Sequence, residues 1–224
     1  MPYELNLDHI ARAFAGGSLQ DRDGAVPIKV IEAGDLIITS QLVAASDAFV
    51  DPMTDPFTQP VPNGRHPVTL AVANYGTDER VAFARVQFSP LPAETWKMAL
   101  TSHAMNPATL GPNEHFGYAV DAGTGSFMDP AGGKLLAARC SRDDDFLDDA
   151  SRTLLTAQWV NLRPDPAREE NIICFSSGFG DGTYPSFFGF DAHGQVCQLV
   201  TDFGLFYEEP EEATKGRRWW QFWR

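Results

Sequence analysis

Residues 178–203 read Gly-Phe-Gly-Asp-Gly-Thr-Tyr-Pro-Ser-Phe-Phe-Gly-Phe-Asp-Ala-His-Gly-Gln-Val-Cys-Gln-Leu-Val-Thr-Asp-Phe. Three glycines in five positions surround Asp181, and each glycine costs about 0.5–1 kcal/mol in chain entropy. A purely structural strand would avoid that cost, so the pattern predicts a loop whose shape matters. The residues that follow predict a β-hairpin fed by this loop. Nothing in the stretch specifies a nucleophile, a metal cage or a nucleotide pocket.

Further strands are predicted in the first ninety residues and directly before the glycine-rich loop. β-branched residues in 27–31 and 36–43 predict two strands separated by an Ala-Gly-Asp turn. Alternation of side chains in 68–74 and 80–88 predicts an antiparallel hairpin. The apolar residues 172–175 predict a strand that runs into the glycine-rich loop.

Helices are predicted in four places. Apolar residues at helical spacing, behind Asn6 or Asp8 as a cap, predict a short helix over residues 7–14. A second helix is expected over about 92–102, with Trp96 and Leu100 on one face. Asp129-Pro130 has the composition of an N-cap and first helical residue, and that helix should end near Arg142. An acidic run then predicts another helical pattern over 143–154.

The order of these elements predicts an α+β fold, a single domain built on a mainly antiparallel β-sheet with flanking helices. Prolines punctuate residues 51–67, which therefore read as a long surface loop. We divide the chain into an N-terminal helix and first strand (1–33), the α+β domain (34–207), and an acidic linker with a basic aromatic tail (208–224).

Charge narrows the classes of partner. The 224 residues carry a formal net charge of −13 at pH 7. The last ten residues carry four cations and no acid, so the preceding residues carry −17. Binding to a phosphate backbone needs a basic face, so we expect no nucleic-acid partner and favour a basic one.

Compartment and cofactor expectations follow from what the sequence lacks. Cys140, Cys174 and Cys197 show no C-x-x-C spacing, which indicates buried thiols in a reducing compartment. The first residues do not resemble a signal peptide, and no stretch approaches the roughly 20 apolar residues of a membrane span. We therefore expect a cytoplasmic protein of bacterial type, without a cofactor.

The C-terminal segment 215–224 reads Lys-Gly-Arg-Arg-Trp-Trp-Gln-Phe-Trp-Arg and follows an acidic, proline-marked linker. This composition predicts an appendage that docks through Trp219, Trp220, Phe222 and Trp223. It could fold back on the acidic body, join copies of the chain or a partner, or contact a membrane surface.

Five separated segments together resemble a known family. They are Leu42-Val-Ala-Ala-Ser-Asp47, Gly64-Arg-His-Pro-Val68, Val120-Asp-Ala-Gly-Thr-Gly-Ser-Phe-Met-Asp129, Ser177-Gly-Phe-Gly-Asp-Gly-Thr-Tyr-Pro185 and Leu199-Val-Thr-Asp-Phe203. In order and spacing they resemble the bacterial family called domain of unknown function 4241 (DUF4241), over roughly residues 34–204. The resemblance implies no established activity. It implies a common cysteine where this chain has Ser126, and an Asp-Pro pair where it has Asp47-Ala48, so a thiol mechanism is disfavoured.

Carboxylates are the first candidates for chemistry. Asp121, Asp129, Asp181 and Asp202 stand at strand ends or in glycine loops, where they could bind Mg²⁺ or Ca²⁺ or form a general acid and base pair. The same positions suit structural roles. Asp129 can cap a helix, Asp181 can hold an Asx turn, Asp202 can tie down the hairpin's exit and Asp121 can brace the next loop. The catalytic candidates are Asp121, Asp181 and Asp202.

Other site chemistries have less support in the pattern. The five histidines, His9, His66, His103, His115 and His193, form no H-x-H or H-E-x-x-H pair, so we predict no metal site. Ser126 lacks the G-x-S-x-G context of a nucleophile elbow. The two glycine loops could bind an anion or another ligand through their backbone amides. The candidate binding residues are Gly180, Asp181, Gly182 and Tyr184 in one loop, and Gly123, Thr124 and Ser126 in the other.

Aromatic residues and acidity favour binding over catalysis. Six aromatic residues surround the glycine-rich loop and could form core or a recognition surface: Phe179, Tyr184, Phe187, Phe188, Phe190 and Phe203. Immunity-type proteins neutralise toxin domains by presenting acids to a basic active site. By that analogy we expect an acidic protein-binding module, with a basic toxin domain as the partner. The alternative is a carboxylate-dependent, possibly metal-assisted hydrolase or a small-ligand-binding protein.

Overall fold

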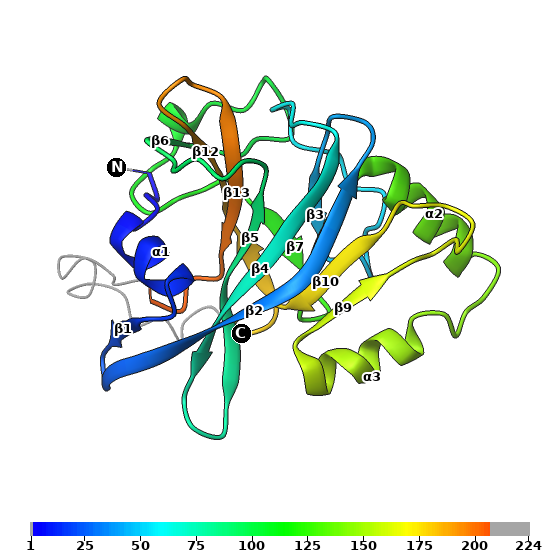
Figure 1. Ribbon diagram of the computed structural model, residues 1–224, viewed down its shortest axis with the longest axis horizontal. Helices are drawn as coiled ribbons and strands as arrows, with labels where there is room; N and C mark the ends of the chain where they lie inside the picture. Colours follow the sequence, from blue (N-terminus) through cyan, green and yellow to red (C-terminus); the bar gives the residue numbers. More distant parts are fainter. Residues whose placement is uncertain (1, 207–224) are drawn as a thin grey trace, which may run out of the picture.

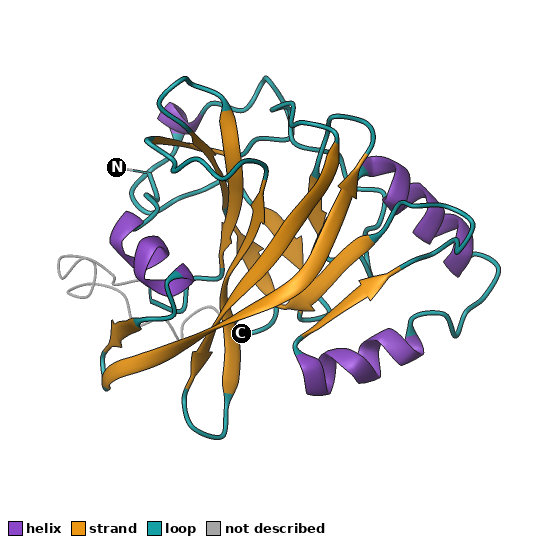
Figure 2. Cartoon of the chain, viewed as in Figure 1, coloured by secondary structure: helices purple, strands orange, loops and turns teal. Residues whose placement is uncertain are grey.

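The structure, a computed structural model, describes residues 2–206 (Figures 1 and 2). The predicted docking residues of the tail, Trp219, Trp220, Phe222 and Trp223, lie outside this described part.

The larger sheet is antiparallel and strongly curved (Figure 2). Within the described residues it has seven strands in the order β1-β2-β4-β5-β13-β12-β6. Their bounds are β1 Ser18–Asp21, β2 Gly24–Ile38, β4 Gly64–Asn74, β5 Glu79–Gln87, β6 Thr95–Met98, β12 Ser186–Phe190 and β13 Val196–Asp202. The predicted hairpin over 68–74 and 80–88 is confirmed as β4–β5, and the hairpin after the glycine-rich loop is β12–β13.

Two smaller sheets complete the described strands. Four strands, in the order β3-β8-β10-β9, span Ala44–Ser46, Thr124–Met128, Ile172–Ser176 and Trp159–Leu162. A two-stranded ladder joins β7 (Tyr118–Val120) to β11 (Gly182–Tyr184). The strand predicted at 172–175 is therefore confirmed as β10.

The helices agree with the local sequence signals at their starts, with one exception. They are α1 (Leu7–Phe14), α2 (Pro130–Cys140), α3 (Asp148–Ala157) and a short 3-10 helix, η1 (Pro107–Thr109). Asn6 caps α1, because its side chain accepts a 3.1 Å hydrogen bond from the His9 amide. Asp129 caps α2 in the same way, because its carboxylate accepts a 2.8 Å hydrogen bond from the Ala131 amide. The exception is α3, because its predicted first residues, 143–147, form turns ahead of the helix.

The expected Ala-Gly-Asp turn is wrong. Residues 24–38 form one long strand, β2, and its pairing with β4 shifts register between Glu32 and Gly34. Gly34 has φ of +92°, so a bulge takes the place of a turn. The strand also ends before residue 43, because the Asp129 carboxylate accepts hydrogen bonds from the amides of Thr39 and Ser40 at 2.7 and 2.8 Å.

The helix expected over 92–102 is also wrong. Residues 95–98 form the edge strand β6. This strand pairs with β12, so that Lys97 lies opposite Phe188. The spacing of Trp96 and Leu100 fits a helix, but Trp96 and Met98 also alternate as in a strand. Pairing with Phe187–Phe190, far later in the sequence, decided between them, and no local signal reports that pairing.

The elements stack in three layers. β10 is buried on both faces: Ile173 and Phe175 join the main core beneath the large sheet, whereas Ile172 and Cys174 join a second core. That second core is closed by α2 and α3, which lie on the outer side of the four-stranded sheet (Figure 1). Helix α1 packs at the other side of the molecule, against β1, β2 and β4 (Figure 1). The fold class is α+β, as predicted. No helix among residues 2–206 is long and apolar enough to cross a membrane.

Candidate functional site

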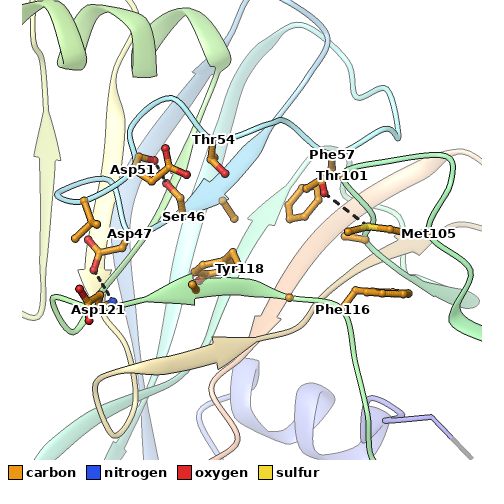
Figure 3. Close-up of a pocket in the computed structure, with 15 residues that line it drawn as sticks. Ser46, Asp47, Asp51, Thr54, Phe57, Thr101, Met105, Phe116, Tyr118 and Asp121 are labelled. Carbon is orange, nitrogen blue, oxygen red and sulfur yellow. Dashed lines mark hydrogen bonds between the residues drawn. The ribbon is translucent and has the colours of Figure 1, made fainter. Parts of the chain in front are cut away.

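A pocket of about 240 Å³ opens where β3, the loop after it, the segment after β6, and β7 meet (Figure 3). Its lining combines acids, hydroxyl groups and apolar side chains. The residues are Ala45, Ser46, Asp47, Val50, Asp51, Thr54, Phe57, Ala99, Thr101, Met105, Phe116, Gly117, Tyr118, Ala119 and Asp121.

A tight turn after β3 presents Asp51 to the pocket. The amides of Val50 and Asp51 donate to the Asp47 carbonyl oxygen at 3.0 and 2.7 Å. The Ser46 hydroxyl donates to the Asp51 carbonyl oxygen at 2.8 Å. These bonds hold the backbone while the Asp51 side chain stays exposed.

Asp47 joins this turn to β7. Its buried carboxylate accepts hydrogen bonds from the amides of Asp121 (3.1 Å), Ala122 (2.6 Å) and Phe49 (3.1 Å). Bonds from N–H groups to a carboxylate are stronger than those between neutral groups. Asp47 therefore fixes Asp121 at the mouth of the pocket. The sequence analysis missed Asp47 as a site residue, although it follows a short apolar segment and lies close before the proline-rich loop.

The apolar wall is held by the proline-rich loop. The Phe57 amide donates to the Val43 carbonyl oxygen at 2.9 Å, and the buried Phe57 ring meets Phe188 edge-on at 5.8 Å between centroids. Met105 accepts a weak hydrogen bond from the Thr101 hydroxyl at 3.7 Å. Phe116 completes this wall. The long loop predicted over residues 51–67 therefore supplies part of the lining, although residues 64–67 belong to β4.

The pocket has two chemically different sides. Figure 3 shows Asp47, Asp51 and Asp121 toward one side, and Phe57, Met105 and Phe116 toward the other. Among residues 2–206, no lysine, arginine or histidine lines the pocket. Asp51 and Asp121 are exposed, so their charges face solvent or an entering group. Such a pocket is suited to an elongated group with a cationic end and an apolar stem.

The structure does not bring the three catalytic candidates together in this pocket. Asp121 lines it, but Asp181 and Asp202 do not. Asp202 is buried at the end of β13, where it accepts hydrogen bonds from the Tyr3 hydroxyl at 2.6 Å and the Gly204 amide at 2.8 Å. Burial raises the pKa of the Asp202 carboxyl, although the Tyr3 bond opposes this shift. Its position matches the structural role considered for it, closure of the hairpin's exit.

The two predicted glycine loops do come together. The Ser177 amide donates to the Gly123 carbonyl oxygen at 3.1 Å, and Gly182 pairs with Val120 in the β7–β11 ladder. The Ser177 and Tyr184 hydroxyl groups both donate to the Gly180 carbonyl oxygen, at 2.9 and 2.8 Å. These two side chains therefore hold the backbone of the loop around Gly180 in place.

Position 178 requires glycine because no other side chain would fit there. It has φ of +47°, and an added Cβ would lie 2.6 Å from Leu205 and 2.8 Å from Phe203. Asp181 is exposed, and among the described residues its side chain has no hydrogen-bond partner, so it holds no Asx turn. Close backbone packing accounts for Gly178, whereas Asp181 projects into solvent.

The remaining binding candidates of the second loop are engaged internally. The Ser126 hydroxyl is fully buried and donates to the Ser46 carbonyl oxygen at 2.7 Å. The Thr124 hydroxyl donates to the Ala122 carbonyl oxygen at 3.2 Å. Ser126 therefore supports the pocket from behind and is not presented to a substrate.

The aromatic residues near the loop are mostly core. Tyr184, Phe187, Phe188, Phe190 and Phe203 are buried, whereas Phe179 is 66% exposed. The Arg80 guanidinium lies 5.1 Å from the Phe179 ring centroid. Of these six residues, Phe179 alone exposes its ring.

Cysteines and candidate metal ligands are dispersed in the described part of the chain. Cys174 and Cys197 are buried and Cys140 is half-buried, and all three are free thiols. Burial raises the pKa of the Cys174 thiol, which keeps it protonated. Residues 2–206 contain no group of three His, Cys, Asp or Glu side chains that could hold a metal ion.

Comparison with known families matches residues 36–201 to the family described as "Protein of unknown function (DUF4241)". The chain belongs to this family. The DUF4241 match includes every residue that lines the pocket and both glycine loops, whereas α1 and β1 lie outside it. No curated protein and no solved structure matches the chain.

Proposed function

We propose that this protein is an acidic, immunity-type binding module, and that the pocket accepts a lysine or arginine side chain of a basic protein partner. The observation that carries the proposal is the two-sided lining. Asp51 and Asp121 supply negative charge at one side, and Phe57, Met105 and Phe116 supply an apolar wall at the other. Long cationic side chains have this same division, because an aliphatic stem carries a charged head.

The size of the pocket favours a side chain over a free ligand. Pockets for drug-sized molecules have volumes of about 300–1,000 Å³. The volume of about 240 Å³ falls below that range. A single side chain that belongs to a larger partner would fill it.

Charge supports the choice of a basic partner. The chain carries −17 before its last ten residues. Complementary potentials accelerate encounter and disfavour wrong partners. The hydrolase alternative was based on Asp121, Asp181 and Asp202, and of these three residues only Asp121 lines the pocket.

Calorimetric titration with the product of the neighbouring open reading frame tests the proposal. The full chain should bind that product, and the double variant Asp51→Asn/Asp121→Asn should bind at least about tenfold more weakly, a loss of about 1.4 kcal/mol. Asp55→Asn is the matched control, because Asp55 is exposed in the same loop but does not line the pocket. Absence of binding contradicts the immunity-type role. Equal affinity of all three chains contradicts the role of the pocket.

A further inference from the structure

A second hollow lies under the N-terminal segment, at the β6 edge of the large sheet. It has a volume of about 410 Å³ and is bordered by residues 2–7, edge strand β6 and Phe187. Its lining is mostly apolar, with two exposed acids. The residues are Pro2, Tyr3, Glu4, Leu5, Leu7, Glu94, Thr95, Trp96, Met98, Pro107 and Phe187. We call it the N-terminal groove.

We propose that the N-terminal groove receives the chain's own C-terminal segment 215–224, with its aromatic rings on the apolar floor and its cations beside Glu4 and Glu94. This docking site is separate from the pocket of the proposed function. Three features support this docking: the position of the last described residue, the opposite charges of segment and groove, and the apolar surface of the groove.

Chain geometry places Phe206, the last described residue, close to the groove. Its ring meets His9 of α1 edge-on, with 6.2 Å between ring centroids. Leu7, at the first position of the same helix, already lines the groove. Trp219 lies thirteen positions after Phe206 in the sequence. A chain of that length can span at most about 45 Å, so the segment reaches the groove without strain.

Charge complementarity selects this occupant. The segment carries Lys215, Arg217, Arg218 and Arg224 and no acid. Glu4 and Glu94 are both exposed on the groove, and its lining has no lysine or arginine among the described residues. Docking would bring these cations beside two carboxylates that form no ion pair within residues 2–206.

The apolar part of the groove suits aromatic rings. Leu7 is 49% exposed, and Leu5, Trp96 and Met98 are only partly buried. β6 is also the outermost strand of its sheet, so its outer edge has no strand partner among the described residues. Rings of Trp219, Trp220, Phe222 and Trp223 would cover this surface, and each large aromatic ring brings about 150–250 Å² of area to such a contact.

Carbodiimide coupling of the full chain tests the proposal, because it joins a carboxylate directly to a lysine amine only where the two touch. Lys215 is the one lysine of the segment. We expect peptides that link Lys215 to Glu94 or Glu4 in the monomeric fraction, at yields well above links to remote exposed acids such as Asp55. Links to the adjacent linker acids are set aside, since neighbours in sequence always meet.

Two tail variants separate docking from simple proximity. Changing Trp219, Trp220, Phe222 and Trp223 together to Ser should reduce the Lys215–Glu94 link about tenfold or more, because burial of the rings contributes most of the attraction. Gln221→Ser, the matched control, should keep the wild-type yield. Both variants lie outside the described core, so they leave the fold of the body intact.

Three results would overturn the proposal. One is a link that persists unchanged in the aromatic variant. Another is a link found only between ¹⁴N and ¹⁵N chains in a mixed sample, which would make a second copy the occupant. The third is absence of the link together with sedimentation of the full chain with phosphatidylcholine–phosphatidylglycerol vesicles, which would place the segment on a lipid surface.

Discussion

The Asp47 carboxylate accepts a 2.6 Å hydrogen bond from the amide of Ala122, a residue 75 positions further along the chain. This bond, with the one from the Asp121 amide, connects the turn after β3 to the exit of β7. The two exposed acids of the pocket, Asp51 and Asp121, therefore lie on either side of one buried carboxylate. The position of each depends on Asp47.

Asp47→Asn should lower the free energy of unfolding by about 1.5–3 kcal/mol, because it removes the charge from a buried acceptor of three amide hydrogen bonds. Urea denaturation measures this change. Asp51→Asn in the same turn is the control and should stay within about 0.5 kcal/mol of wild type, since its side chain is exposed. Equal effects of the two variants would contradict the role given to Asp47.

Asp181→Asn should leave stability within about 0.5 kcal/mol of wild type. Asp181 is exposed, and its side chain has no hydrogen-bond partner among residues 2–206. Thermal unfolding of the variant checks this. A clear loss of stability would restore the Asx-turn interpretation of the glycine-rich loop.

Asp202 should make stability fall as the pH rises. Burial raises the pKa of this carboxyl, so the folded state holds the proton more tightly than the unfolded state does. Its favourable contribution is complete below the ordinary value of about 3.9 and is lost as the pH passes through the raised value. Asp202→Asn removes that dependence, so its unfolding free energy should gain on the wild type between about pH 4 and about pH 7. Parallel urea-denaturation results across this range would show that Asp202 titrates normally.

Gly133→Ala should destabilise the protein by about 1–3 kcal/mol, although alanine favours a helix more than glycine does. An added Cβ on α2 would overlap the Pro52 carbonyl oxygen and crowd the Met128 sulfur. Because Pro52 follows Asp51, the substitution should also displace the acidic side of the pocket. Calorimetry gives the melting temperature, and a rise in that temperature would contradict the close packing at Gly133.

Local signals predicted the parts of this fold that depend on neighbouring residues. The cap at Asn6, the cap at Asp129 and the β4–β5 hairpin all follow from patterns within a few positions. Trp96 illustrates the opposite case, because its strand exists through pairing with β12. Gly34 is a second example of this dependence on distant residues, since only the register with β4 distinguishes a bulge from a turn.

The candidate site was predictable only in part for the same reason. Asp121 was identified from its position before a glycine-rich segment, and it lines the pocket. Asp181 and Asp202 have similar local contexts, but one points to solvent and the other is buried beneath Tyr3. Asp47 receives two of its three amide hydrogen bonds from residues more than 70 positions away, which no pattern near residue 47 could indicate.

The most direct test of the pocket is a titration of the ¹⁵N-labelled full chain with N-acetyl-arginine amide, followed by nuclear magnetic resonance. The account predicts saturable shifts of amide signals in residues 46–51 and 119–122. The shifts should be much smaller with N-acetyl-norleucine amide, which has the apolar stem without the cation, and they should be lost in Asp51→Asn/Asp121→Asn but kept in Asp55→Asn. Shifts that are absent, that are equal for both probes, or that persist in the double variant would contradict a cation-accepting pocket.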